Sequence, residues 1–230
     1  MTPLRIYLCG QGSFGRAALD LLLEEGHTVV GVSSPPQRDG RPDRLAMGAH
    51  ARRLPWLPAG HLNAGLLPDD TDLIVCAHSH DFIGRATRLR ARLGAVGYHP
   101  SLLPVHRGRD AVRWTIRMGD RVTGGSVYWL TDSVDAGPLA AQRHVLVPPG
   151  IDASELWRTE LFPLGVSLLR KVLRDLAGGV VVRVPQDERC ATWEPSIGRA
   201  PLRRPDLIML PEHAGRGDAY VVDGDTHTIL

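Results

Sequence analysis

The amino-acid sequence predicts an α/β fold with a mostly parallel sheet, helices on both faces and a short C-terminal extension. Short apolar runs typical of buried parallel strands alternate with segments of helical periodicity. The first run leads through Gly10-Gln-Gly-Ser-Phe-Gly15 into a helical segment and then into a second apolar run, the order of a parallel strand–helix–strand unit. Polar side chains, among them His99, follow the ends of later runs, where open α/β sheets carry their functional sites.

The expected strands are short apolar runs bounded by glycine, proline or polar residues. They lie at 4–9, 27–32, 54–57, 72–77, 95–99, 122–130 and 140–147. The first runs are expected to form the buried parallel part of the sheet. The last run is expected to lie antiparallel at the sheet edge.

The expected helices carry apolar residues at intervals of three or four positions. They lie at 16–25, 44–53, 61–67, 83–93, 110–118 and 153–176. Gly26, Gly119 and Gly178 follow three of these segments, and glycine favours helix ends. Asp152 is a good N-cap for the last helix, and Pro163 inside it predicts a kink or two separate segments.

The composition excludes some classes of partner. The 230 residues include 27 Lys+Arg and 25 Asp+Glu, so bulk charge would not hold a nucleic acid or an acidic membrane. The N-terminal apolar run is too short for a signal peptide, and no run approaches membrane-spanning length. Cys9 and Cys76 lie in apolar runs and Cys190 stands alone, which predicts free thiols in a reducing cytoplasm.

The composition changes after Pro195, where proline and arginine become frequent. This change predicts one domain over 1–195 and a C-terminal extension over 196–230. Within the extension, Asp223-Gly224 is a turn signal that predicts a β-hairpin over 219–230.

The stretch from 97 to 137 carries the strongest candidate for chemistry. An apolar run leads to His99, and Pro100 ends regular pairing, so the imidazole is expected at a strand tip. A second strand leads to Asp132 and Asp135 in a turn rich in small residues. A histidine and an aspartate at two such ends could meet and act as a general acid/base pair. The alternative is a surface histidine and a turn aspartate that never meet.

The glycine motif leaves several interpretations open. Its setting between strand and helix is that of a dinucleotide site, but Ser33 and Ser34 stand where NAD would need an acidic residue. Arg38 and Arg41 could instead bind the 2′-phosphate of NADP. The glycines could also serve only close packing, or their N–H groups could face another phosphate or substrate.

A weak metal signal follows the strand at 72–77. His78-Ser-His-Asp81 places two histidines and an aspartate at its carboxyl end. A loop role without a metal is more frequent for such a pattern. A metal-dependent hydrolase using His78, His80 and His99 stays open as an alternative.

Several motifs in a fixed order resemble the folate-dependent formyltransferases. His-Pro-Ser-Leu-Leu-Pro at 99–104 is followed by Arg107-Gly108, a strand and a Val-Asp-x-Gly-Pro turn at 134–138. The glycine loop, the loop at 30–41 and the Gln…Ala-Thr-aromatic-x-Pro segment at 186–195 also match. This family includes methionyl-tRNA formyltransferase, glycinamide ribonucleotide transformylase and the sugar N-formyltransferases, and the likeness covers most of the chain.

The resemblance implies a Rossmann-like formyltransferase fold that passes the formyl group of 10-formyltetrahydrofolate to an amine in one-carbon metabolism. His99 and Asp135 match the family's catalytic histidine and aspartate. Gly97 stands where the family has its catalytic asparagine, whose amide helps to stabilise the oxyanion. Loss of one such donor costs about 10²–10³ in rate. Candidates for a replacement donor are Tyr98, Ser101, Arg107 and Arg109.

The resemblance also implies the binding residues. The formyl donor is expected to contact His80, Asp81, Phe82, Ile83, Thr131, Asp132 and Ser133. The substrate is expected to contact Gly10, Gly12, Ser13, Ser101 and Arg107. No metal is expected in the site.

The near-neutral charge favours a small-molecule amine acceptor, such as a sugar nucleotide, an amino acid or a siderophore precursor. The absence from this sequence of the large domain with which methionyl-tRNA formyltransferase holds tRNA favours the same acceptors. The expected protein is a cytoplasmic transferase without nucleic-acid or membrane partners, and a homodimer is possible. The alternative from another class is a non-catalytic or divergent family member that binds a ligand or partner, as Gly97 suggests.

Overall fold

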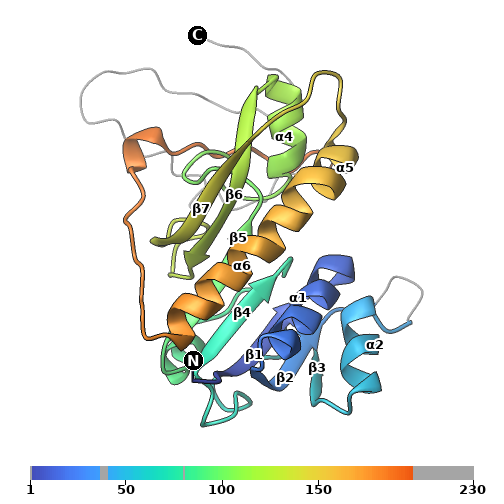
Figure 1. Ribbon diagram of the computed structural model, residues 1–230, viewed down its shortest axis with the longest axis vertical. Helices are drawn as coiled ribbons and strands as arrows, with labels where there is room; N and C mark the ends of the chain where they lie inside the picture. The colour runs from blue at the N-terminus through green and yellow to red at the C-terminus, as the bar shows by residue number, and fades with distance from the viewer. Residues whose placement is uncertain (1, 37–40, 80, 199–230) are drawn as a thin grey trace.

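The computed structural model describes residues 2–36, 41–79 and 81–198, which build a sheet in the order β3-β2-β1-β4-β5-β6-β7 (Figure 1). Its strands are β1 (Arg5–Gly10), β2 (Thr28–Ser34), β3 (Trp56–Pro58), β4 (Leu73–Ala77), β5 (Gly94–His99), β6 (Val122–Trp129) and β7 (Leu139–Leu146). The strands from β3 to β5 in this order are parallel, whereas β6 and β7 each run antiparallel to the preceding strand. The predicted fold class and the antiparallel edge strand are therefore confirmed.

Helices connect the strands and cover the sheet. They are α1 (Gly12–Glu24), α2 (Arg44–Ala51), α3 (Arg85–Arg90), α4 (Ala111–Met118), α5 (Ala153–Leu156) and α6 (Phe162–Ala177). A π-helical turn (Trp157–Leu161) joins α5 to α6, and a 3₁₀ turn (Glu188–Cys190) follows later. Pro163 lies in the first turn of α6, where its missing N–H costs least. The predicted break near Pro163 and the Asp152 cap, which accepts from the Glu155 N–H, are both present.

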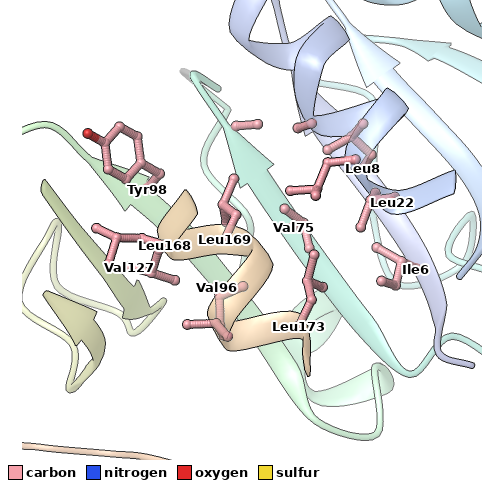
Figure 2. Packing of buried hydrophobic residues seen from close by; sticks show 14 of the residues in the cluster. Ile6, Leu8, Leu22, Val75, Val96, Tyr98, Val127, Leu168, Leu169 and Leu173 are labelled. Atoms are coloured by element: carbon pink, nitrogen blue, oxygen red, sulfur yellow. The ribbon is translucent and has the colours of Figure 1, made fainter. Parts of the chain in front are cut away.

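The main hydrophobic core lies between the sheet and the helices α1 and α6, which cover the same face (Figure 1). Figure 2 shows Leu168, Leu169 and Leu173 of α6 directed onto the strands, beside Val96 of β5 and Val127 of β6. All five side chains are buried. The long helix thus holds together the strands on which the site is built.

The opposite face carries a smaller apolar cluster next to α3. It contains Tyr7, Cys9, Leu62, Leu67, Ile74, Cys76, Ile83, Ala91 and Ala95. Cys9 and Cys76 are buried free thiols there, and Cys190 is an exposed one. The expectation of unpaired cysteines is confirmed.

Three helix predictions differ from the structure, and the first of these helices, α1, already begins at Gly12 and not at residue 16. Residues 61–67 form no helix, because the Asn63 side chain accepts from the N–H groups of Gly65 and Leu66 and so stabilises a turn. The helix predicted at 83–93 is shorter, since α3 begins after Gly84 and ends at Arg90. Local side-chain-to-backbone hydrogen bonds and glycine outweigh helical periodicity in the last two of these segments.

The chain from 180 to 195, called the return segment below, runs back from the end of α6 along the sheet edge toward α4 (Figure 1). Leu139 at the start of β7 exchanges two backbone hydrogen bonds with Val184. The indole N–H of Trp129 donates to the Val182 carbonyl at 2.7 Å. Farther along the segment, the backbone of Trp193 forms an isolated parallel β-bridge with that of Arg107.

The return segment is the C-terminal part of the predicted domain 1–195. The predicted hairpin at 219–230, and most of the predicted extension, lie outside the described residues. In the described part of the chain, every helix is too short or too polar to cross a membrane.

Candidate active site

His99 is the last residue of β5, as expected of a residue followed by Pro100, and it is 7% exposed. Its Nε2 lies 2.6 Å from the backbone oxygen of His106. Because a carbonyl oxygen only accepts, Nε2 carries the proton of this hydrogen bond. The other ring nitrogen, Nδ1, lies 3.7 Å from Oδ2 of Asp135. The predicted histidine and aspartate therefore meet.

The route by which Asp135 reaches His99 differs from the prediction. Because β6 is antiparallel to β5, Trp129 at its end pairs with Val96, three positions before His99. The end of β6 is therefore not next to the tip of β5. The turn that follows folds back over the sheet and brings Asp135 to the imidazole. The expectation of two strand tips meeting was wrong, although the pair itself forms.

Asp135 is held by three hydrogen bonds in an unusual backbone conformation. Its φ is +53°, in the left-handed region that aspartate tolerates better than most residues. Oδ2 accepts from the Gly108 N–H at 2.7 Å, and Oδ1 accepts from the Tyr128 hydroxyl at 2.5 Å. The Gln186 side chain donates to the Asp135 carbonyl at 2.8 Å. The carboxylate is thus fixed in position and orientation beside His99.

The residue that holds His99, His106, is itself held between two carboxylates. Its Nε2 lies 2.7 Å from Oδ2 of Asp120, and its Nδ1 lies 3.0 Å from Oε1 of Glu194. Its backbone N–H donates to Oγ1 of Thr192 at 2.8 Å. His106 also has a left-handed φ of +57°, which these contacts stabilise. The return segment therefore fixes the position of the His106 loop, whose carbonyl at His106 orients His99.

The charge of His106 predicts how stability depends on pH. Burial by itself lowers the pKa of this imidazole, but the Glu194 and Asp120 carboxylates together outweigh burial and raise the pKa above its usual value. A raised pKa means that the folded state binds the proton more tightly than the unfolded state. The stabilisation is complete below the unfolded pKa of about 6.5 and is lost as the pH rises through the higher folded pKa.

We therefore expect His106→Gln to cost less stability at mildly alkaline pH than at mildly acidic pH. Urea unfolding of both proteins across this range measures the difference. His144→Gln is the matched control, because His144 is an exposed histidine on β7. A cost for His106→Gln that does not change with pH would contradict a charged His106.

Two residues expected to bind substrate are already engaged within the protein. Arg107 is 3% exposed, and its guanidinium donates to the side chains of Gln186 and Glu188. Ser101 is fully buried and donates to the Val105 carbonyl at 2.5 Å. The contacts of Arg107 join the loop after His99 to the return segment. The contact of Ser101 lies within that loop. Direct substrate contact by Arg107 or Ser101 stays a prediction.

The candidates for a replacement oxyanion donor do not stand beside Gly97. Tyr98 lies on the other face of the sheet, where its hydroxyl donates to the Leu161 carbonyl at 2.7 Å. Ser101 and Arg107 are engaged as described, and Arg109 is exposed. The polar side chain next to Gly97 is Tyr128, which sequence reasoning missed. The signal that could have found it is the register of an antiparallel β5–β6 pair.

The glycine motif has an internal partner. Both carboxylate oxygens of Asp43 accept from the Gly12 N–H, at 3.0 and 2.9 Å, and Asp43 is 7% exposed. A buried carboxylate at this place disfavours a phosphate there. At Gly10, a Cβ would collide with the Ala77 carbonyl, so this glycine allows close strand packing. These contacts favour the packing interpretation of the motif over the phosphate one.

The contacts described do not test the predicted substrate contacts of the motif. Ser13 accepts a hydrogen bond from the Arg44 guanidinium at 2.5 Å. Arg38, one of the two arginines considered for a 2′-phosphate, lies outside the described residues. Substrate contact by Gly10, Gly12 or Ser13 stays a prediction.

The two segments expected to bind the formyl donor lie side by side, joined by an arginine. Arg88 of α3 is 7% exposed, and it donates to the Ile83 carbonyl at 2.6 Å and to Oδ1 of Asp132 at 2.5 Å. The side chain of Asp132 is therefore engaged with α3. Arg88 thus brings together the two segments that the resemblance assigns to the donor.

Side chains of these two segments differ in exposure. Phe82 is 70% exposed and Val134 is 44% exposed, whereas Ile83 is buried. Asp81 accepts a weak hydrogen bond from Ser33 at 3.4 Å.

The turn after β6 is closed by a local hydrogen bond. The Thr131 hydroxyl donates to the Ser133 carbonyl at 3.1 Å. His80 lies outside the described residues. Contact of these residues with a donor stays a prediction.

A metal centre was the alternative for the histidines after β4. Within 2–36, 41–79 and 81–198, no three His, Cys, Asp or Glu side chains gather closely enough to hold a metal ion. The His78 ring lies 6.0 Å from that of Trp157. Burial lowers the pKa of His78, partly opposed by the charge of Asp43.

Comparisons with known proteins agree with this architecture. Residues 60–164 match the family model described as formyl transferase. Mitochondrial 10-formyltetrahydrofolate dehydrogenase of Mus musculus is 36% identical over 201 residues, which cover 83% of this chain and 22% of that protein. Methionyl-tRNA formyltransferase of Chloroflexus aurantiacus is 35% identical over 200 residues, which cover 82% of this chain and 64% of that protein. The chain thus spans about a fifth of the length of the dehydrogenases that it matches.

A solved structure extends the likeness to the fold. The N-formyltransferase of Helicobacter canadensis, in complex with folinic acid and dTDP-3-aminofucose, has a TM-score of 0.69 at 13% identity. The match covers 83% of this chain and 70% of that chain. Together with the sheet order, these matches show that the chain resembles the formyl transferases in sequence and has their fold.

Proposed function

We propose that this protein transfers the formyl group of 10-formyltetrahydrofolate to the amine of a small acceptor, with His99 and Asp135 as the acid/base pair. The observation that carries the proposal is the approach of His99 Nδ1 to Asp135 Oδ2 at 3.7 Å in a chain that resembles the formyl transferases. The donor is proposed from the relatives, since one is named for 10-formyltetrahydrofolate and a structural neighbour binds folinic acid.

The chain offers a fitting place for a folate donor. Arg88 holds the segment ending at Ile83 against the turn after β6. Phe82 and Val134, one from each segment, expose apolar surface that a flat ring could cover. We assign the binding of the donor ring to these segments. The bound donor would supply an activated N-formyl group.

The proton chemistry falls to His99. An acceptor amine loses a proton when its nitrogen becomes an amide, and the donor nitrogen would gain a proton as its bond to the formyl carbon breaks. Because Nε2 already carries the hydrogen bonded to the His106 carbonyl, Nδ1 is the ring atom that can take this proton. Asp135 Oδ2 lies near Nδ1 and stabilises the protonated ring. Burial of both residues keeps competing water away.

The acceptor is proposed to be a small amine without a phosphate at the glycine motif. Asp43 occupies the Gly12 N–H, and its negative charge would repel a phosphate there. The same charge would attract an ammonium group. A cationic or neutral amine is thus favoured at this loop.

Calorimetric titration with 5-formyltetrahydrofolate, a stable analogue of the donor, tests the proposal. We expect one site with micromolar affinity. Phe82→Ser should weaken it about tenfold, since covering a phenylalanine contributes about 1.5 kcal/mol or more. Leu146→Ser is the matched control, because the exposed fraction of Leu146 on β7, 72%, is similar to that of Phe82. Absence of binding at millimolar analogue would contradict the folate donor, and binding would justify a screen of amine acceptors.

A further inference from the structure

We propose that Tyr128 is a positioning residue of the acid/base pair, and that Gly97 is small so that the Tyr128 ring can reach Asp135. The proposal rests on the function proposed above, because it assigns a role within the same site. It is carried by the β5–β6 register, by the hydroxyl contact and by the space at Gly97.

The sheet register brings Tyr128 to the site. In the antiparallel pair of β5 and β6, Gly97 lies opposite Tyr128 and His99 lies opposite Ser126. Residues opposite each other, and residues two apart on one strand, share a face of the sheet. Tyr128 therefore stands on the face from which His99 meets Asp135.

Gly97 makes room for the tyrosine. A Cβ at this position would lie 3.3 Å from Cε1 of Tyr128 and 3.1 Å from Cδ1 of Leu130, both closer than ordinary contacts. The backbone of Gly97 is not among the left-handed ones, so its conformation does not require glycine. What the position requires is space, and the aromatic ring lies where a side chain at 97 would begin.

The hydroxyl completes the support of Asp135. The Gly108 N–H holds Oδ2, and the Tyr128 hydroxyl holds Oδ1 at 2.5 Å. With one donor on each oxygen, the carboxylate plane cannot rotate, and Oδ2 stays near His99 Nδ1. Burial and the neighbouring Asp135 charge raise the pKa of Tyr128 well above its usual value, so the hydroxyl keeps its proton and remains a donor.

A four-protein cycle tests the proposal, using wild type, Tyr128→Phe, Gly97→Ala and the double variant. We expect Tyr128→Phe to lower kcat about 10- to 100-fold with KM for the donor little changed, because a misplaced catalytic group costs about this much. Gly97→Ala should lower kcat in the same direction, because its Cβ would crowd Cε1 of the Tyr128 ring, and it should lower kcat little further once the hydroxyl is gone. Wild-type kcat in Tyr128→Phe, or fully additive losses in the double variant, would overturn the proposal.

Tyr98→Phe is the matched control, because it removes a hydroxyl that bonds the Leu161 carbonyl on the other face. We expect it to lower stability while kcat is kept. An equal fall of kcat in both tyrosine variants would show a general packing effect and overturn the assignment.

A readout without turnover separates this proposal from the proposed function. Nitrogen NMR of the histidine rings, with His99→Gln to identify the His99 signals, reports the environment of Nδ1. Tyr128→Phe should shift the Nδ1 signal of His99 but leave that of His144 unchanged. An unchanged His99 signal would overturn the role of Tyr128. If wild type transfers no formyl group but the signal shifts, the proposed function fails and the positioning role stands.

Discussion

Replacement of His99 is expected to lower kcat by about 10²–10⁴-fold, the usual contribution of a positioned acid/base group, in a protein that stays folded. His99→Gln is the sharper variant. Its amide can still donate to the His106 carbonyl, so it keeps the hydrogen bond at 2.6 Å and loses only the nitrogen that exchanges protons. Formyl transfer under saturating donor and amine, with urea unfolding of the same preparation, measures both effects.

The control for this substitution is His144→Gln on β7, where the histidine is exposed and contacts none of the site residues described above. Its kcat should equal that of wild type. A folded His99→Gln protein with wild-type kcat would remove the imidazole from the chemistry and leave the site without an acid or base at the tip of β5.

Asp135→Asn is expected to lower kcat about 10²–10³-fold with a small loss of stability. The variant removes the charge that stabilises a protonated His99, while asparagine tolerates the left-handed φ of +53°. Asp135→Ala should lose activity to a similar extent and also about 3 kcal/mol of unfolding free energy. That larger loss comes from the strained backbone and from the unpaired donors of Gly108 and Tyr128.

The comparison of Asp135→Asn with Asp135→Ala separates the effect of the lost charge on kcat from the effect of the lost contacts on stability. Turnover and denaturant unfolding are measured on both, with Asp175→Asn on α6 as the control for removal of one surface carboxylate. Similar kcat values and different stabilities support the assignment. A fully active Asp135→Asn protein would mean that the carboxylate serves only to hold the turn.

The strand and helix alternation could be predicted because each element carries its own local pattern. Apolar runs mark the buried strands, and Asp152 and Pro163 mark the start and the break of the long helix. The helix expected at 61–67 failed because one side chain, Asn63, competes for the backbone. Such local competition is not visible in the apolar periodicity.

The pairing of His99 with Asp135 could be proposed from motifs, but its geometry depends on contacts between distant parts of the chain. The direction of β6 and its register with β5 decide that Tyr128 faces Gly97. Likewise, Asp43 meets Gly12 across 31 positions of sequence. No local pattern specifies such a contact, so neither the pairing of Asp43 with the Gly12 N–H nor the role of Tyr128 could be predicted from the sequence alone.

The contacts of the return segment have a consequence for how the protein becomes competent during synthesis. The partner of Arg107, Gln186, is synthesised 79 residues after it. At about 5–20 residues per second on the ribosome, this delay lasts about 4–16 s. During that time the loop that orients the imidazole lacks its partners, and α6, which covers the strands around His99, is itself still being made. The site is therefore completed late, after most of the described chain has been synthesised.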